Sequence, residues 1–471
     1  MKRITQVMRT KLCFTVLFVA MLPIAGICSD LVLSHAKIYT SPTEPPVEDG
    51  VVLIHNGRIT AVGPSSTIKA PHFARAVTTI DCHGMTVTAG FWNSHVHIFT
   101  AELLDAEHRS SAELAGELKK MFLRRGFTTV FDTASVLANT NNIRNRIAKG
   151  EIEGPRIFTV GDPFYPQGGT PVYIKGFLEQ HHIPSAEVSS PEEAVARVRR
   201  QIEAGADGAK IFAGAIVQTG VVPMPLDIAK AIVAETHRHG KPVFAHPSDT
   251  QGLEVSLQSG VDILAHTAPM SGDWSPAFVQ RLKDAHMALI PTLTLFDVEA
   301  DKAGVSSEEK QQWLRQASQE LKAYSEAGGE ILFGTDAGYI DRYDTTEEFQ
   351  LMARAGMSYQ HILASLTTNP AKRFGLANKS GRIAKGMDAD LVVLNGDPAQ
   401  DVTAFSKVRY AVRAGKLIYS LRGWRQPVFL NWRKRWLNWR KPWHCANDNG
   451  GAGQGKADHR FRWPAFLRSV A

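Results

Sequence analysis

Residues 87–100 read VTAGFWNSHVHIFT, an apolar, strand-forming run that ends in two histidines, His95 and His97. Because successive side chains of a strand point to opposite faces, residues two apart leave on the same face. Two neutral imidazoles on one face suit a divalent metal ion. The alternative is an ordinary pair of surface or core histidines, which an isolated His-x-His motif would favour.

The region between residues 86 and 381 alternates short apolar runs with amphipathic helical stretches, which is typical of strand–helix units around a parallel sheet. Helices are expected at 191–205, 225–240, 252–260 and 278–286. The expected strands are 87–95, 127–133, 156–161, 208–214, 241–246, 261–267, 287–293 and 330–336. Since eight such strands close a barrel, we predict an α/β fold of the (β/α)8 TIM-barrel type. The alternative is an open doubly wound sheet, but no Gly-x-Gly-x-x-Gly or phosphate-binding loop follows any expected strand.

Residues of metal-binding type recur where the expected strands end. Catalytic groups of a (β/α)8 barrel lie at this end of the strands. Each residue alone has a structural explanation, such as a helix N-cap for Asp336 or a turn before proline for His246. Together they favour one metal site. The six candidate ligands are His95, His97, Lys210, His246, His266 and Asp336.

The loop after the third expected strand, residues 161–176, reads GDPFYPQGGTPVYIKG. Loops at this end of a barrel carry substrate specificity. We therefore take Tyr165, Thr170 and Tyr173 as candidate substrate contacts. Aromatic residues in a long loop can equally serve only to pack it, so this alternative stays open.

The sequences on both sides of this region consist of short β runs separated by turns. The Asn56-Gly57 pair lies between two alternating apolar runs and predicts a hairpin. We predict one small β-sandwich domain built from both chain ends, residues 29–86 and 382–420, beside a barrel domain of residues 87–381.

The N-terminal segment has a basic start and an apolar run over residues 12–27, as a secretory signal peptide does. We predict a signal peptide at residues 1–28 and export of the protein to the periplasm or the medium. A single membrane anchor is the alternative, but the apolar run is shorter than the roughly 20 residues that a bilayer requires.

The C-terminal tail, residues 421–471, interleaves tryptophan with arginine and lysine. This composition suits an anionic membrane surface; the alternative is a poorly ordered extension without a role. The tail supplies much of the formal net charge of +7, so that charge does not indicate nucleic-acid binding by the barrel. No nucleic-acid-binding motif is present, and we expect no nucleic-acid partner.

Several motifs together carry a family resemblance: GFWNSHVH, GADGAKIF, PVFAHP, ILAHT, ILFGTDAG and TTNPAKRFGL. Through them the chain resembles the metal-dependent amidohydrolase superfamily over about residues 31–420. It is most similar to an exported branch with a carboxylated lysine, which includes imidazolonepropionase-like and prolidase-like proteins.

The resemblance implies a binuclear site with two divalent metal ions, zinc in this branch. It implies a carboxylated Lys210 as the bridging ligand, one metal held by His95, His97 and Asp336, and the other held by His246 and His266. A hydroxide that bridges the metals would attack the scissile carbonyl. Asp336 would be the catalytic residue that moves the proton to the leaving nitrogen.

Two positions depart from the family pattern. Asn93 stands where the family commonly has aspartate, which predicts an altered metal affinity. Thr170 stands where dipeptidase-like relatives often have the histidine of a Gly-Gly-His motif. This second departure weakens a peptidase assignment.

The predicted function is that of an exported amidohydrolase that cleaves an amide, cyclic amide or dipeptide-like carbon–nitrogen bond in a small molecule. Two alternatives stay open. The same site could hydrolyse an ester, a lactone or a phosphotriester, or the chain could be a non-catalytic protein that binds an envelope or polyanion through its basic tail. The sequence does not constrain the oligomeric state.

Overall fold

The computed structural model of the chain describes residues 30–68 and 77–421. The predicted signal peptide and, beyond residue 421, the predicted basic tail lie outside the described residues, so both stay predictions. In the described part of the chain, no helix has the length and apolar character needed to cross a membrane.

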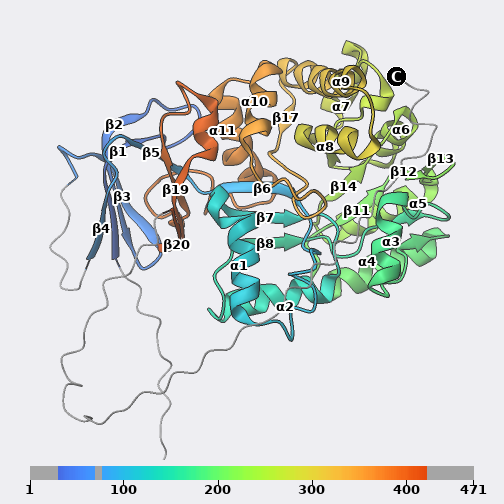
Figure 1. The fold of residues 1–471 in the computed structure, drawn as a ribbon, viewed down its shortest axis with the longest axis horizontal. Helices are drawn as coiled ribbons and strands as arrows, with labels where there is room; N and C mark the ends of the chain where they lie inside the picture. The colour runs from blue at the N-terminus through green and yellow to red at the C-terminus, as the bar shows by residue number, and fades with distance from the viewer. Residues whose placement is uncertain (1–29, 69–76, 422–471) are drawn as a thin grey trace, which may run out of the picture.

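All eight strands expected between residues 87 and 336 are present, and they run parallel within two sheets (Figure 1). One sheet has the order β6-β7-β8 and the other has the order β11-β14-β15-β16-β17. Their bounds are β6 Phe91–Val96, β7 Phe127–Asp132, β8 Arg156–Thr159, β11 Ala209–Phe212, β14 Val243–His246, β15 Ile263–Ala265, β16 Ala288–Ile290 and β17 Glu330–Ile331. The α/β prediction is confirmed.

Backbone hydrogen bonds lie at both junctions between the two sheets, where they involve residues that follow β8 and β17. Beside β11, the Phe164 N–H donates to the Lys210 carbonyl (2.8 Å), and the Phe212 N–H donates to the Phe164 carbonyl (2.9 Å). At the other junction, the Ser94 N–H of β6 donates to the Phe333 carbonyl (2.7 Å). The last expected strand, residues 330–336, is therefore regular only over β17, because the residues that follow β17 hydrogen-bond to β6.

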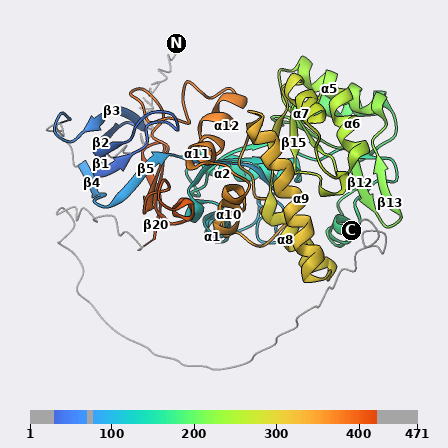
Figure 2. The same ribbon diagram turned by 90° about the horizontal axis from the view of Figure 1, so that it is seen from above.

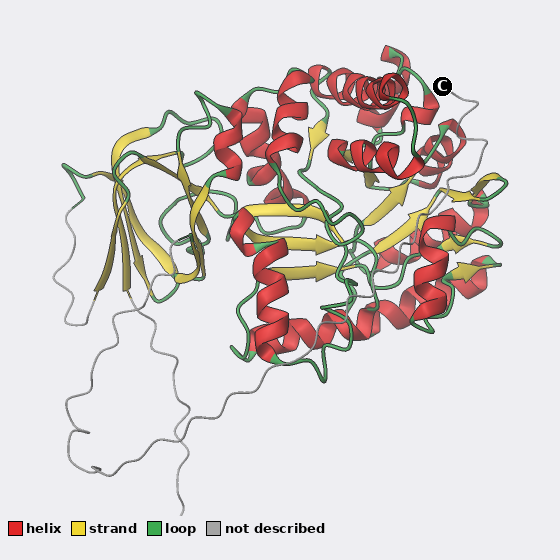
Figure 3. Ribbon diagram, in the orientation of Figure 1, coloured by secondary structure: helices red, strands yellow, loops and turns green. Residues whose placement is uncertain are grey.

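Helices cover the outer faces of these strands (Figure 3). Their bounds are α1 Ser111–Met121, α2 Leu137–Ala148, α3 Val172–Gln180, α4 Pro191–Glu203, α5 Leu226–Arg238, α6 Thr250–Ser259, α7 Pro276–Asp284, α8 Leu293–Ala303, α9 Ser307–Glu326, α10 Thr346–Arg354, α11 Tyr359–Leu366 and α12 Thr368–Arg373, with 3-10 turns η1 Leu123–Arg125, η2 Pro269–Ser271 and η3 Val402–Ser406. The four helices expected from the sequence correspond to α4, α5, α6 and α7, with ends shifted by at most two residues. Local chemistry explains such ends: α4 begins after Ser190, whose hydroxyl accepts from the Glu193 N–H, with Pro191 in the first turn.

Short elements that the sequence did not predict lie in the loops after β8 and β11. They are the pair β9 Tyr165–Pro166 and β10 Glu187–Val188, and the hairpin β12 Gly214–Val217 and β13 Gly220–Pro223. The β9–β10 pair brings together the two ends of the segment that contains α3. This pairing fixes α3 over the end of the strands where the candidate ligands lie.

Strands from both chain ends join in one sheet of eight, beside the parallel strands (Figures 1 and 2). Its strands are β1 Asp30–Ile38, β2 Val47–His55, β3 Arg58–Pro64, β4 Val77–Asp81, β5 Met85–Ala89, β18 Leu391–Asn395, β19 Val408–Arg413 and β20 Lys416–Ser420. The N- and C-terminal strands meet where β5 pairs antiparallel with β18. The predicted Asn56-Gly57 hairpin joins β2 to β3, with both residues at positive φ. The topology is that of one continuous sheet, so two packed sandwich layers stay a prediction.

Candidate metal centre

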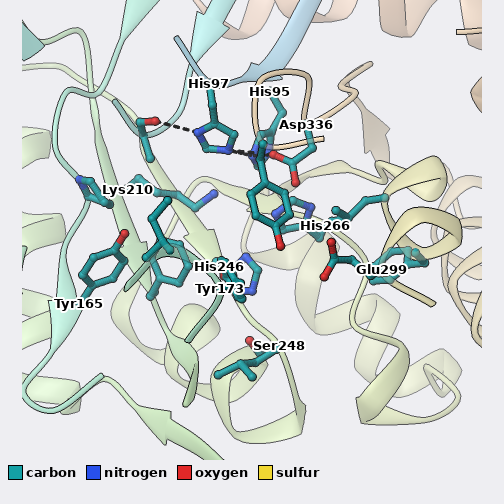
Figure 4. Close-up of a pocket in the computed structure, with 18 of the residues that line it drawn as sticks. His95, His97, Tyr165, Tyr173, Lys210, His246, Ser248, His266, Glu299 and Asp336 are labelled. Atoms are coloured by element: carbon teal, nitrogen blue, oxygen red, sulfur yellow. Dashed lines mark hydrogen bonds and ion pairs between the residues drawn. The ribbon is translucent and has the colours of Figure 1, made fainter. Parts of the chain in front are cut away.

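Three of the candidate ligands converge on one point. His95 lies in β6, His97 directly follows β6, and Asp336 follows β17. The Nε2 atoms of the two histidines lie 3.3 Å apart. Asp336 Oδ1 lies 3.2 Å from His95 Nε2 and 2.8 Å from His97 Nε2 (Figure 4). All three residues are buried, and their ligand atoms are close enough together to hold one metal ion. The spacing argument for residues 95 and 97 is therefore supported by the geometry.

The backbone brings these groups together under constraint. Asp336 has φ of 61° and His266 has φ of 89°, conformations that non-glycine residues rarely adopt. Gly338 has φ of 103°, and a Cβ atom at this position would lie 1.9 Å from the His97 carbonyl oxygen. The chain after Asp336 therefore passes so close to β6 that only glycine fits there.

Hydrogen bonds on the far side of two imidazoles orient the ring nitrogens. His97 Nδ1 lies 2.7 Å from the Ala134 carbonyl oxygen, which can only accept, so Nδ1 carries the proton. His266 Nδ1 lies 2.6 Å from Thr292 Oγ1, and that hydroxyl donates to the Pro291 carbonyl. The hydroxyl therefore accepts from His266. In both rings the Nε2 lone pair is left to face the site, as a metal ligand requires.

The other three candidates line the same cavity as the first group (Figure 4). Lys210 lies in β11, His246 ends β14, and His266 directly follows β15. The ring centroid of His266 lies 4.5 Å from that of His95 and 4.8 Å from that of His246. The cavity has a volume of about 530 Å³. The structure thus brings all six predicted ligands to one place at the carboxyl ends of the strands.

Burial sets the charge state of these groups. It lowers the pKa of Lys210 to about 7 and that of His95 to about 3, and it holds the pKa of His266 well below its ordinary value. For Asp336, burial acts to raise the pKa, but the adjacent imidazoles of His95 and His97 hold it well below the ordinary value. The set therefore offers imidazole lone pairs and an ionised carboxylate, which is a donor set for a cation.

Two of the three proposed substrate contacts line the cavity. Tyr165, in β9, packs its ring 4.8 Å from Phe212, and Tyr173, in α3, lies 5.2 Å from the Tyr339 ring. Thr170 is not among the cavity-lining residues. Its N–H and its hydroxyl both donate to the Glu187 carboxylate, so it braces the loop. The structure gives no support to a substrate contact by Thr170.

The asparagine that departs from the family pattern has a clear structural role. Asn93 Oδ1 accepts from the backbone N–H groups of His95 (3.3 Å) and Thr335 (3.2 Å). Its Nδ2 donates to Thr335 Oγ1 (2.7 Å). An amide can accept and donate at once, so Asn93 ties the backbone of one ligand to the residue before another.

Two residues that support the site were missed from the sequence. Asp132, at the end of β7, is fully buried and accepts from hydroxyls of Ser135, Thr140 and Thr159. It holds the start of the loop whose Ala134 carbonyl orients His97. Thr292 is the other, and it orients His266. An aspartate at a strand end was a readable signal for Asp132, whereas nothing in the sequence marks Thr292.

Comparisons with known proteins agree with this geometry. Residues 86–418 match the profile of the amidohydrolase family. Ochratoxinase of Aspergillus niger is 23% identical over 413 residues, which cover 79% of this chain and 83% of that protein. Imidazolonepropionase of Thermoplasma acidophilum is 23% identical over 404 residues, covering 79% and 90%. The crystal structure of a Xaa-Pro dipeptidase with bound methionine superposes with a TM-score of 0.70 at 23% identity, covering 83% of this chain and 100% of that chain, and so shares the fold.

Proposed function

Since this chain belongs to the amidohydrolase family, whose homologues are hydrolases acting on carbon–nitrogen bonds, we propose that it is an exported enzyme that hydrolyses an amide bond in a small molecule with the help of two divalent metal ions. The observation that carries the proposal is the convergence of two imidazole Nε2 atoms and one carboxylate oxygen within 3.3 Å of one another.

The residues present fit a pair of metal ions. Asp336 Oδ1 is buried without a hydrogen bond from any described residue, although it faces two imidazole nitrogens. Such an arrangement is costly unless a cation lies among the three atoms. His246 and His266 supply imidazoles for a second ion, and nitrogen and oxygen donors of this kind suit zinc.

Lys210 fits a bridging role only after modification, because an ammonium group cannot be a ligand. Its side chain is 1% exposed, and burial lowers its pKa to about 7, so a neutral amine is available to react with carbon dioxide. We propose that Lys210 is carboxylated, which gives it two ligand oxygens.

Bound metal ions would supply Lewis acidity at the scissile carbonyl and would lower the pKa of water to near neutrality. The chain itself supplies the proton transfer. The adjacent imidazoles of His95 and His97 hold the pKa of Asp336 well below its ordinary value, so the carboxylate is ionised. Its remaining oxygen, Oδ2, can take a proton from the attacking water. The same atom then returns the proton to the departing nitrogen, which leaves as a neutral amine.

A closed barrel is part of this proposal. Single parallel bridges between Val96 and Ala337 and between Phe164 and Ile211, at the two junctions of the sheets, support closure. A closed barrel would hold the six proposed ligands at constant positions relative to one another, which catalysis requires. Export is the other part, and sequencing the N-terminus of protein recovered outside the cytoplasm would test cleavage near residue 28.

The activity is tested by amine release from a panel of amides, with full-length mature protein whose metal content is measured. Asp336→Asn is expected to lose about 10²–10⁴-fold in turnover, since it removes the proton-transfer group. Asp341→Asn makes the same chemical change at an exposed position and serves as the matched control. Equal turnover by Asp336→Asn and wild type would refute the role of Asp336, and no amine from any amide would refute the activity.

A further inference from the structure

The cavity above the candidate ligands is walled by large apolar side chains. Those that come from α3, α8 and α9 are Ile174, Phe177, Leu178, Leu295, Phe296 and Trp313. The side chains of α3 are partly buried or exposed, although the helix is apolar. The helix therefore keeps its apolar side on the cavity, and the cavity suits an apolar molecule.

The charged side chains of the cavity wall, apart from the candidate metal ligands, are acidic. They are Asp162 and Glu299, and among the described lining residues Lys210 is the one lysine or arginine. Lys210 lies among the candidate metal ligands and is 1% exposed, so it is not available to a distant part of a substrate. Away from the candidate ligands, the described wall thus lacks a basic side chain that could pair with a substrate carboxylate.

Two basic side chains near the cavity already have partners elsewhere. Arg197 donates to the carbonyl oxygens of Ala186 (2.7 Å) and Pro163 (2.6 Å), which brace the loop that carries α3. Lys302 Nζ lies 2.9 Å from Glu299 Oε1. Neither is a lining residue. Both side chains bind other groups of the protein, so neither is available to a substrate in the cavity.

Aromatic rings flank the candidate ligands on both sides. The Phe212 and His246 centroids are 4.7 Å apart. On the other side, the Phe99 centroid lies 5.3 Å from that of His97 and 5.1 Å from that of Phe177. Aromatic rings prefer offset or edge contacts at these separations. An aryl group next to the scissile bond would find such contacts in this cavity.

We propose that the substrate is an uncharged amide with aryl or bulky apolar groups beside the scissile bond, and that the cavity selects against substrates with a free carboxylate, free dipeptides included. This inference rests on the proposed function, because it names the substrate class of the same site. Moving a carboxylate from water into the apolar part of this cavity, where the lining away from the candidate ligands carries no basic side chain, is unfavourable.

A matched pair of compounds tests the proposal: N-benzoylphenethylamine and N-benzoylphenylalanine, which differ by one carboxylate. With the full-length metal-loaded protein, we expect kcat/KM for the uncharged amide to exceed that for the acid by about tenfold or more. An equal or inverted preference would overturn the proposal.

A charge placed in the wall should reverse the selection. Ile174→Arg puts a guanidinium on the cavity side of α3, and it is expected to raise kcat/KM for the acid relative to the uncharged amide by about tenfold. Gln180→Arg adds the same charge at the exposed end of α3, outside the lining, and should leave the ratio at the wild-type value. If Gln180→Arg changed the ratio of the two kcat/KM values as much as Ile174→Arg does, the charge of the cavity wall would not be the cause of the selectivity.

Binding separates this inference from the proposed activity. Calorimetric titration of both compounds into Asp336→Asn measures affinity without turnover. Tighter binding of the uncharged amide, with no amine released by wild type from any amide of the panel, would support the apolar site and refute the hydrolase proposal. Failure of the uncharged amide to bind at millimolar concentration, or tighter binding of the acid, would overturn the apolar-substrate inference whatever the activity.

Discussion

Thr292→Val is expected to weaken metal binding although residue 292 cannot be a metal ligand. Thr292 Oγ1 accepts from His266 Nδ1 at 2.6 Å and donates to the Pro291 carbonyl at 2.8 Å. Thr292 is fully buried, and His266 is 4% exposed, so water does not replace the lost hydroxyl. Valine has the same β-branched shape, so the left-handed backbone of residue 292 is equally strained in both variants.

The magnitude follows from the group left without a partner. A buried donor without a hydrogen bond costs roughly 1–3 kcal/mol. The substitution leaves the His266 Nδ1–H unpaired, whereas the Pro291 carbonyl still accepts from the Thr267 N–H at 3.5 Å. We therefore expect the free energy of unfolding of the metal-free protein to fall by about 1–3 kcal/mol. Loss of the group that orients a ligand imidazole typically weakens metal affinity by about 10–100-fold.

Urea unfolding in the presence of a chelator measures the first effect, and competition with a chromophoric chelator measures the second. Thr292→Ser keeps the hydroxyl and should retain metal affinity close to that of wild type. If Thr292→Val bound metal as tightly as Thr292→Ser, the assignment of the His266 ring nitrogens would be wrong.

Three further changes have defined outcomes. Asp132→Asn places an amide N–H₂ among hydroxyl donors and should lower the free energy of unfolding, measured by urea titration, by about 1–3 kcal/mol. An unchanged free energy of unfolding would contradict the proposal that Asp132 holds the loop in place. Gly338→Ala would press a Cβ against the His97 carbonyl and should abolish stoichiometric metal binding, whereas Gly168→Ala, also at positive φ but in open space, should bind metal as wild type does. Burial raises the pKa of Glu348 from 4.5 to about 7, so the unfolded chain releases this proton first and stability falls as pH rises between these values. The free energy of unfolding of wild type, relative to that of Glu348→Gln, should therefore fall by about 2–3 kcal/mol between about pH 5 and about pH 8. If the difference between the two proteins stayed constant over this range, the raised pKa of Glu348 would be refuted.

The sequence was sufficient to predict the strands and where they end, because those features are local. Period-two and continuous apolar runs identify strands from a few neighbouring residues, and parallel strands connected by helices must place their carboxyl ends together. The positions of His246 and His266 at strand ends and of Lys210 within a neighbouring strand therefore predicted a common site. The motifs around them predicted the family to which the chain belongs.

Contacts between residues far apart in the chain could not be predicted from local sequence patterns. Thr170 was taken as a substrate contact from its place in a loop, but a glutamate 17 residues away determines what its hydroxyl binds. The role of Thr292 depends on an imidazole 26 residues away. Neither contact leaves a pattern in the local sequence.

The sequence by itself determined the strand–helix order, the candidate ligands and the end of the strands at which they lie, since each depends on the periodicity and identity of near neighbours. The tertiary structure alone decided which imidazole nitrogen faces the site, which carboxylate is ionised and which side chains wall the cavity. These properties depend on burial and on distances of a few ångströms between residues that only the folded chain brings together.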